Sequence, residues 1–362
     1  MPRLGLSIYP EHSTPERDIA YLEKAATLGF SRVFTCLLSV NEDVDALKDT
    51  FAQINQRAHQ LGFEVIFDVA PSVFQKLNIS YDDLSFFKEL HADGIRLDEG
   101  FDGQKEAMMT RNPQGLKIEI NASQPTKYVD NILSYRPYKD NLITCHNFYP
   151  QKYTGLDYAL FMETSTAMKA HNLKVAAFVS SQEKNTFGPW PIDEGLCTLE
   201  MHRHLPIDLQ ARHLYATEAV DDILIANAYA SDEELERLSS IHPGKLTFRV
   251  DFEPAASAVE MDIALNFNHI IRGDMSRYMG RSTMSRIAYA SADIPAHDTD
   301  PLKRGDIVIL NNGYGRYKGE LHVILDDMEN DGRKNRIGHL NDNEQILLEF
   351  VQPWVAFQLL KD

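Results

Sequence analysis

Cysteine and net positive charge are both scarce in this sequence of 362 residues. Its three cysteines, Cys36, Cys145 and Cys197, have no C-x-x-C spacing, which argues against a disulfide framework and fits a reducing compartment. The formal net charge of -17 argues against a nucleic-acid partner, because such binding needs a basic surface. An anionic ligand would therefore need a local basic pocket.

Long hydrophobic runs are absent as well. No segment reaches the roughly 18 apolar residues of a membrane span, and Met1-Pro2-Arg3 leads directly into an expected strand instead of a signal peptide. We therefore expect a cytoplasmic protein with no membrane partner.

Motifs for cofactors and metals are also missing. No Gly-rich phosphate loop follows an expected strand, which argues against a dinucleotide fold, and no Gly-x-Ser-x-Gly elbow supports a serine hydrolase. His202, Arg203 and His204 lack a third metal ligand at a suitable spacing and are typical of a solvated helix face. We predict neither a metal nor a cofactor.

A repeat of strand and helix dominates the first two thirds of the sequence. Leu28-Gly29-Phe30 recurs as Leu61-Gly62-Phe63, each before an expected strand, which indicates a unit of about 33 residues. Eight such units end near Ile241 and predict an α/β fold, a (β/α)₈ TIM barrel. The expected strands lie near residues 3–10, 31–38, 63–69, 94–99, 116–122, 141–148, 174–180 and 221–228.

The pattern changes beyond about Pro243. Short β-type runs follow, separated by Gly and Asn turns such as Asn311-Asn312-Gly313. We predict a barrel domain over residues 1–241 and a small β-rich domain over 242–362. The β-type runs lie at residues 245–252, 304–310, 319–325 and 345–351.

The most informative stretch runs from Asp93 to Gly100, where two adjacent carboxylates follow an expected strand. Side chains alternate across a strand, so Arg96 and Asp98 share the face that points into the barrel. Asp98 lies at the carboxyl end of the fourth strand, where barrel enzymes place catalytic groups. Glu99 either turns into the barrel mouth as a second acid or caps the helix that begins near Asp102.

A second acid, Glu119, precedes Asn121 at the end of the fifth strand. Neighbouring strands lie about 4.8 Å apart, so we expect Asp98 and Glu119 to flank one glycosidic bond as paired acids do in glycosidases. The alternative is structural, because inward charges such as Glu119 with Arg96, or Lys117 with Glu64, also form interior ion pairs.

Other polar residues at strand ends are candidates for contacts with sugar hydroxyls and rings. His146 is either a catalytic base or a hydrogen-bonded structural residue. The predicted substrate-binding residues are Asp68, Asn121, His146, Asn147, Tyr149 and Asn227.

A basic cluster stands out against the acidic whole. Arg272, Arg277, Arg281 and Arg286 occur within fifteen residues, with Asp274 opposing them. Guanidinium groups suit phosphate or carboxylate, so we predict that Arg272, Arg277 and Arg281 bind phosphate. The alternatives are an interdomain network of salt bridges, or a phosphate site in the loops after the last barrel strands.

Four segments together resemble a known bacterial family. They are Leu-Gly-Leu-Ser-Ile-Tyr-Pro at residues 4–10, Gly-Ile-Arg-Leu-Asp at 94–98, His-Asn-Phe-Tyr-Pro at 146–150 and Arg-Gly-Asp-Met-Ser-Arg at 272–277. That family pairs a TIM barrel with a cyclophilin-like β domain and includes 6-phospho-N-acetylmuramidases. The resemblance implies hydrolysis of the β-1,4 bond between N-acetylmuramic acid 6-phosphate and N-acetylglucosamine in cell-wall (peptidoglycan) recycling.

We therefore predict a glycosidase whose partner is a small phosphorylated amino-sugar disaccharide. Asp98 and Glu119 act on the bond directly, or the substrate's own 2-acetamido oxygen attacks while Asp98 and Glu99 orient it and supply the proton. The rival hypotheses are a sugar-phosphate isomerase or aldolase that uses Lys117 or His146, and a non-catalytic sugar-phosphate binding protein. The acid–base assignment, the stereochemical course and the oligomeric state stay open.

Overall fold

The computed structural model describes residues 2–37 and 44–361. By its internal contacts the chain divides into two units, Met1–Ser240 and Ile241–Asp362. Across the described ranges, no helix is long and apolar enough to cross a membrane.

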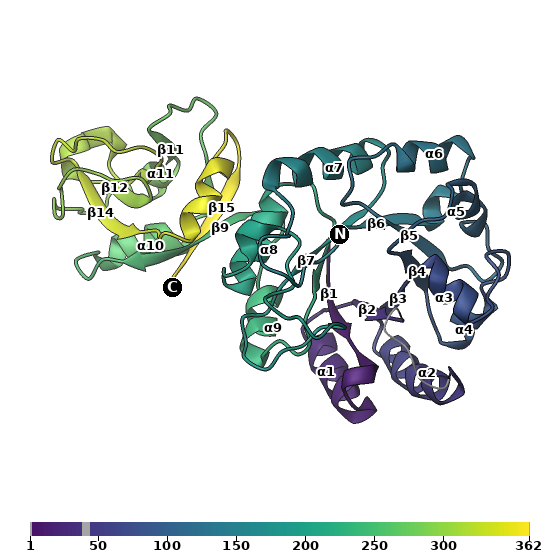
Figure 1. Ribbon diagram of the computed structural model, residues 1–362. Coiled ribbons are helices and arrows are strands. Elements are labelled where there is room, and N and C mark those ends of the chain that lie inside the picture. The colour runs from purple at the N-terminus through teal and green to yellow at the C-terminus, as the bar shows by residue number, and fades with distance from the viewer. Residues whose placement is uncertain (1, 38–43, 362) are drawn as a thin grey trace. The chain divides into compact units, whose positions relative to one another are not determined.

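The first unit is a closed barrel of eight parallel strands in sequence order, which confirms the predicted TIM barrel. Figure 1 shows its helices outside the ring of strands. The strands are β1 (Arg3–Ile8), β2 (Arg32–Cys36), β3 (Glu64–Val69), β4 (Gly94–Leu97), β5 (Lys117–Asn121), β6 (Leu142–Cys145), β7 (Val175–Val179) and β8 (Asp222–Ile225). The α-helices are α1 (Pro15–Thr27), α2 (Val44–Gln60), α3 (Pro71–Lys76), α4 (Ser85–Glu89), α5 (Gln104–Met109), α6 (Tyr128–Ser134), α7 (Tyr158–Ala170), α8 (Ile207–Ala216) and α9 (Asp232–Ser239). Short 3₁₀ helices occur at Pro10–His12, Lys139–Asn141 and Glu200–His202.

The recurring glycines end the first two long helices as the repeat predicts. Gly29 and Gly62 have φ values of +84° and +89°, a left-handed conformation that glycine adopts without a steric penalty. The residue after each glycine donates its N–H to the carbonyl of Ala25 or Ala58. This pattern is the Schellman ending, and it turns each chain directly into the next strand.

Charged side chains fill one part of the barrel interior. Arg32 binds Glu119 and Asp222, the latter at 2.8 Å between Nη1 and Oδ2. Burial would raise the pKa of Asp222, but Arg3 and Arg32 hold it below its usual value. The network is therefore charged and paired, which limits the cost of burial. Its six members are Arg3, Arg32, Glu64, Lys117, Glu119 and Asp222.

Apolar side chains form a separate cluster inside the barrel and toward its mouth. They come from β2, β6, β7 and β8 and from residues just beyond strands, such as Tyr9 after β1, and Phe148, Phe187 and Tyr229 pack against them. The polar side chains of the barrel mouth therefore come from the ends of β3, β4, β5 and β6. Its buried members are Tyr9, Phe34, Cys36, Cys145, Ala176, Phe178, Leu196, Leu224, Ala226 and Ala228.

The second unit is built on a mixed sheet of seven strands in the order β10-β15-β9-β14-β12-β13-β11. The N–H of Arg272 donates to the carbonyl of Arg281 at 2.8 Å, which links the segments at the two edges, so the sheet is nearly closed. The strands are β9 (Leu246–Phe252), β10 (His269–Ile270), β11 (Met279–Ser282), β12 (Asp306–Leu310), β13 (Leu321–Ile324), β14 (Lys334–His339) and β15 (Ala356–Lys361). The helices are α10 (Ala258–Asn266), α11 (Ser285–Ala288) and two 3₁₀ helices at Asn312–Tyr317 and Glu344–Phe350.

The last 3₁₀ helix corrects one expectation from the sequence. Residues 345–351 were expected to be a β-type run, yet Glu344–Phe350 is helical. A helical turn lets the consecutive residues Leu347 and Leu348 both be buried, whereas a strand would direct them to opposite faces.

Candidate active site

Arg96 organises the polar part of the barrel mouth. It lies near the carboxyl end of β4, directly opposite Asp68 of β3. Its Nη1 atom donates to Asp68 and, at 3.1 Å, to Asp98, while Nη2 donates to Asn147. One guanidinium therefore holds two carboxylates and an amide that three different strand ends supply.

The two carboxylates bound to Arg96 differ in exposure. The side chain of Asp68 is buried, whereas that of Asp98 is 37% exposed. Burial raises the pKa of Asp68 to about 7, although Arg96 opposes this rise. Asp98 is therefore the carboxylate that a ligand reaches.

A pocket of about 540 Å³ opens at this side of the mouth. Asp98 and Glu99 both line it, beside the aromatic rings of Phe101 and Tyr128. The exposed carboxylate of Glu99 has no hydrogen bond or ion pair within the part of the chain that the structure describes. The remaining lining residues are Gly100, Asn121, Gln124, Thr126, Lys127 and Asn131.

A buried carboxylate holds the loop that carries these acids. Glu106 accepts hydrogen bonds from the backbone N–H groups of Phe101 and Gly103 and from the Tyr128 hydroxyl. Gly103 is the N-cap of α5, so Glu99 does not cap that helix. These hydrogen bonds to Glu106 fix the loop between β4 and α5, and Glu99 faces the pocket.

Glu119 does not lie where the sequence led us to expect. Its side chain is fully buried and binds Arg32 inside the barrel, and it does not line the pocket that holds Asp98. Glu119 lies opposite Arg96 in the strand register, so it is one layer deeper than Asp98. The expectation that Asp98 and Glu119 meet at the barrel mouth was therefore wrong. Glu119 instead forms an interior ion pair, and its partner is Arg32.

The other predicted sugar-binding residues have different positions. Asn121 lines the pocket, and its Nδ2 lies 3.4 Å from the Asp98 carbonyl oxygen. Asn147 and Tyr149 are partly exposed near Arg96. His146 is fully buried between Ser165, at 2.8 Å from Nε2, and Ser123. Burial, with Arg96 nearby, lowers the pKa of His146 to about 3, so it is a neutral hydrogen-bonding residue.

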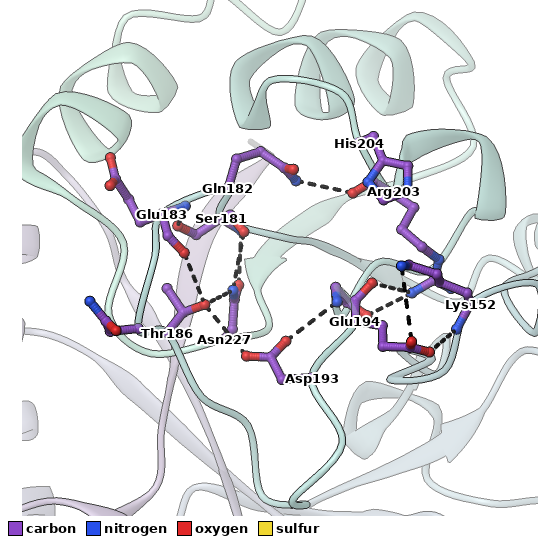
Figure 2. Close-up of a pocket in the computed structure, with 12 residues that line it drawn as sticks. Lys152, Ser181, Gln182, Glu183, Thr186, Asp193, Glu194, Arg203, His204 and Asn227 are labelled. Carbon is purple, nitrogen blue, oxygen red and sulfur yellow. Dashed lines mark hydrogen bonds and ion pairs between the residues drawn. The ribbon is translucent and has the colours of Figure 1, made fainter.

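A second pocket of about 410 Å³ lies among the loops that follow β6, β7 and β8. Asn227 lines it, but Figure 2 shows its amide bound within the protein. Asn227 accepts a hydrogen bond from the N–H of Ser181 and donates to the Ser181 carbonyl and the Thr186 hydroxyl. These bonds fasten the loop after β7 to the end of β8.

The charges of the second pocket are mixed. Lys152 lies beside Glu194 in Figure 2, with Nζ 4.0 Å from the carboxylate. Arg203 is buried, and its guanidinium donates to Glu200 and to backbone carbonyls, including that of Tyr149. His202 is buried as well, so the expectation that these residues form a solvated helix face was wrong for both. Lys152 and Arg203, two cations of this pocket, therefore already face acidic or carbonyl groups.

The arginine cluster of the second unit is divided among acidic partners. Arg272 and Arg281 both bind Asp274, and Arg277 binds Asp326 at 2.9 Å between Nη2 and Oδ2. The three guanidinium groups do not share one site in this arrangement. Their predicted role in phosphate binding stays a prediction.

Several pocket residues were not singled out from the sequence. They include Phe101, Gln124, Lys127, Tyr128 and Asn131. All five belong to the segments that follow β4 and β5, so the rule that places barrel sites at the carboxyl ends of strands was sufficient to find them. No group of three residues suited to metal binding occurs among the residues that the structure describes.

The fold and the site together define a class of protein. A (β/α)₈ barrel with adjacent carboxylates and amides around a pocket at its carboxyl end is typical of enzymes that act on small polar substrates. Family models described as 6-phospho-N-acetylmuramidase, N-terminal, and 6-phospho-N-acetylmuramidase, C-terminal, match residues 4–240 and 246–360. The chain belongs to the 6-phospho-N-acetylmuramidase family, which confirms the resemblance found in the sequence.

Two solved structures resemble the whole chain. An uncharacterized B. cereus protein is 49% identical, with a TM-score of 0.92, and the match covers 99% of each chain. A conserved protein of unknown function from Enterococcus faecalis is 26% identical, with a TM-score of 0.75, over 99% of this chain and 96% of that one. A search of curated proteins finds no match.

Proposed function

We propose that this protein hydrolyses the β-1,4 bond between N-acetylmuramic acid 6-phosphate and N-acetylglucosamine, with the substrate's 2-acetamido group as the nucleophile. The observation that carries this proposal is that Asp98 and Glu99 line one pocket at the end of β4. The family supplies the phosphosugar class of substrate.

The two acids have complementary surroundings. Asp98 accepts a hydrogen bond from Arg96. Its carboxylate also accepts a hydrogen bond from the acetamido N–H and so orients that group. Glu99 has no hydrogen bond or ion pair within residues 2–37 and 44–361 and serves as the proton donor. Asn121, Asn147 and Tyr149 supply polar contacts for the sugar ring.

The reaction then proceeds in two balanced steps. Glu99 protonates the glycosidic oxygen as its bond to the anomeric carbon breaks, and the acetamido oxygen forms a bond to that carbon. Asp98 stabilises the positive charge that develops on the acetamido nitrogen. A water molecule next attacks the anomeric carbon as the bond from that carbon to the acetamido oxygen breaks, which restores the acetamide. The water gives a proton to Glu99, and the configuration is retained.

The rival reactions have less support. Lys117, the candidate Schiff-base residue, binds Glu64 at the start of β5, whereas barrel sites lie at the carboxyl ends of strands. His146 is buried between two serines. A direct mechanism that pairs Asp98 with Glu119 conflicts with the burial of Glu119. We also propose a cytoplasmic location and a role in cell-wall recycling, in line with three buried free cysteines.

The test is hydrolysis of the synthetic phosphorylated disaccharide by the full chain, followed by chromatography and mass spectrometry of the released sugars. Matched substrates lack the 6-phosphate or the N-acetyl group. We expect release from the full substrate with retained configuration, and little release when the acetyl group is missing. Asp98→Asn and Glu99→Gln should each lower kcat by about 10²–10⁴-fold.

Asp102→Asn is the matched control, because Asp102 is an exposed carboxylate in the same loop that pairs with Lys105. It should keep full activity. Equal rates with and without the acetyl group would refute nucleophilic assistance. Equal rates with and without the phosphate would remove phosphate recognition, and no release from any substrate would favour a non-catalytic sugar-phosphate binding protein.

A further inference from the structure

Three basic side chains of the second unit share one face of its sheet. Arg281 of β11 lies directly opposite His322 of β13, and His322 lies opposite Val308 of β12. Two residues further along β12, Leu310 lies opposite Lys334 of β14. Residues opposite one another, and residues two apart along a strand, point to the same side. Arg281, His322 and Lys334 are hereafter the second-unit basic cluster.

Lys334 is a buried cation without an acidic partner. The residue is 7% exposed, and its ammonium donates to the Tyr314 hydroxyl at 2.9 Å. No ion pair joins it to a carboxylate within residues 2–37 and 44–361. A buried charge without a counter-ion is costly, so this position favours the arrival of an anion.

The carboxylate in this cluster is already occupied. Glu320 binds Arg286 through Oε1 and His322 through Oε2, the latter at 3.2 Å from Nε2. It is therefore not available to neutralise Lys334. Its bond to Nε2 leaves Nδ1 of His322 buried and without a hydrogen-bond partner among the described residues.

In the strand order, β13 with His322 lies between β11 with Arg281 and β14 with Lys334. Burial is the largest cause of the lowered pKa of His322, Glu320 opposes this shift, and Arg281 and Lys334 add to it. Arg281 is 31% exposed along its side chain and binds Asp274 through the backbone oxygen at 3.0 Å and the carboxylate at 3.4 Å. The cluster is thus buried at Lys334 and open to solvent at Arg281.

We propose that Arg281, His322 and Lys334 form a binding site for a phosphate-sized oxyanion. The anion supplies the missing counter-ion of Lys334 and takes hydrogen bonds from Arg281 and from Nδ1 of His322, which binds a proton from solvent when the anion arrives. Free phosphate and the phosphate group of a sugar ester share this chemistry. The site uses Arg281 of the arginine cluster but neither Arg272 nor Arg277, and it does not depend on the proposed glycosidase reaction.

The test is calorimetric titration of the full chain with inorganic phosphate and with glucosamine 6-phosphate at constant ionic strength. N-acetylglucosamine serves as the neutral probe. We expect saturable binding of a phosphate probe, and Lys334→Met and Arg281→Gln should each weaken it about tenfold or more. Stronger binding of one probe identifies the sugar ester or free phosphate as the source.

Lys303→Met is the matched control, because Lys303 is 65% exposed along its side chain and pairs with Asp327 in the same unit. It should bind phosphate as the unaltered chain does. Lys334→Met should also unfold at a similar temperature in phosphate-free buffer, because the loss of the contacts with Tyr314 is offset by the removal of a buried charge that has no acidic partner. That measurement separates loss of the site from loss of the fold.

Equal affinity in all variants, or no saturable binding to either probe, would overturn the proposal. The same titration in Asp98→Asn separates this site from the proposed function. Binding there without hydrolysis supports the anion site whatever the barrel does, and hydrolysis by a chain that binds no phosphate probe refutes the anion site alone.

Discussion

At the scale of single residues, two acids at the ends of neighbouring strands lie in different environments. Asp98 follows the last residue of β4, while Glu119 is two residues before the end of β5. Arg96 lies opposite Glu119 in the register of β4 and β5, so Asp98 lies opposite Asn121. The contact between Asn121 and the Asp98 carbonyl agrees with this register. A difference of one layer along the barrel therefore separates Asp98, which lines a pocket, from Glu119, which forms an interior ion pair.

The first prediction separates the roles of these two acids. Glu119→Ala should lower the free energy of unfolding by about 3–5 kcal/mol, because it leaves the buried Arg32 without one partner. Asp98→Asn should change it by less than about 1 kcal/mol, because Asp98 is partly exposed. Urea unfolding measures both values.

Activity per folded molecule gives the complementary measurement for the same pair. Glu119→Ala should keep the kcat of the unaltered protein wherever it stays folded, while Asp98→Asn loses it. A stable but inactive Glu119→Ala variant would return Glu119 to the catalytic site.

At the scale of elements, the loop from Asp98 to Gly103 positions the proposed chemistry. Three donors converge on Glu106 beneath this loop, two from its backbone and one from Tyr128 of α6. A single buried carboxylate thus joins the segment after β4 to the helix after β5. Glu106 is a positioning residue, because it does not line the pocket itself.

The second prediction concerns this positioning residue. Glu106→Gln should lower kcat about tenfold, because a neutral amide holds the loop less firmly. The free energy of unfolding should fall by about 1–3 kcal/mol. Steady-state kinetics and urea unfolding measure the two effects.

Tyr128→Phe is the graded comparison, since it removes one of the three donors to Glu106. Its effects on kcat and stability should have the same sign and be smaller. An unchanged kcat in Glu106→Gln, together with lowered stability, would show that Glu106 supports the fold alone.

At the scale of the whole molecule, both units bury neutral histidines. Burial lowers the pKa of His146 to about 3 and that of His213 to about 4 in the first unit. It lowers the pKa of His269 to about 4 in the second. The unfolded chain binds protons near pH 6.5, so it takes up more protons than the folded chain as the pH falls.

The third prediction follows from this difference in proton binding. The stability that the neutral histidines supply is present above about pH 6.5 and is lost as the pH falls toward about 4. Asp68 opposes this trend because its pKa is raised. The buried histidines with a lowered pKa outnumber the acids with a raised pKa, so their effect on stability dominates. The melting temperature should fall by several degrees between pH 7 and pH 5, as scanning calorimetry would measure.

His269→Gln tests the assignment in the second unit. Glutamine retains hydrogen-bonding capacity toward Ser282 and the Ile263 carbonyl, the present partners of His269, without the titration. The variant should depend less on pH across this range. A melting temperature that rises on acidification would contradict the prediction.

The sequence by itself determined the barrel. Helical periodicity, glycines such as Gly29 and Gly62 in the left-handed conformation, and alternation along strands are local properties that each segment carries alone. They were sufficient to place eight strands, to direct Arg96 and Asp98 inward and to put Asp98 at the mouth. The cyclophilin-like character of the second unit stays a prediction.

The tertiary structure decided the depth of each side chain and the partners of each charge. The relative shift of β4 and β5 put Glu119 beside Arg32, far away in the sequence, because register between strands is set by non-local contacts. The helical turn at Glu344–Phe350 and the gathering of Arg281, His322 and Lys334 have the same origin. Pairing and burial depend on which segments meet, and no local pattern contains that information.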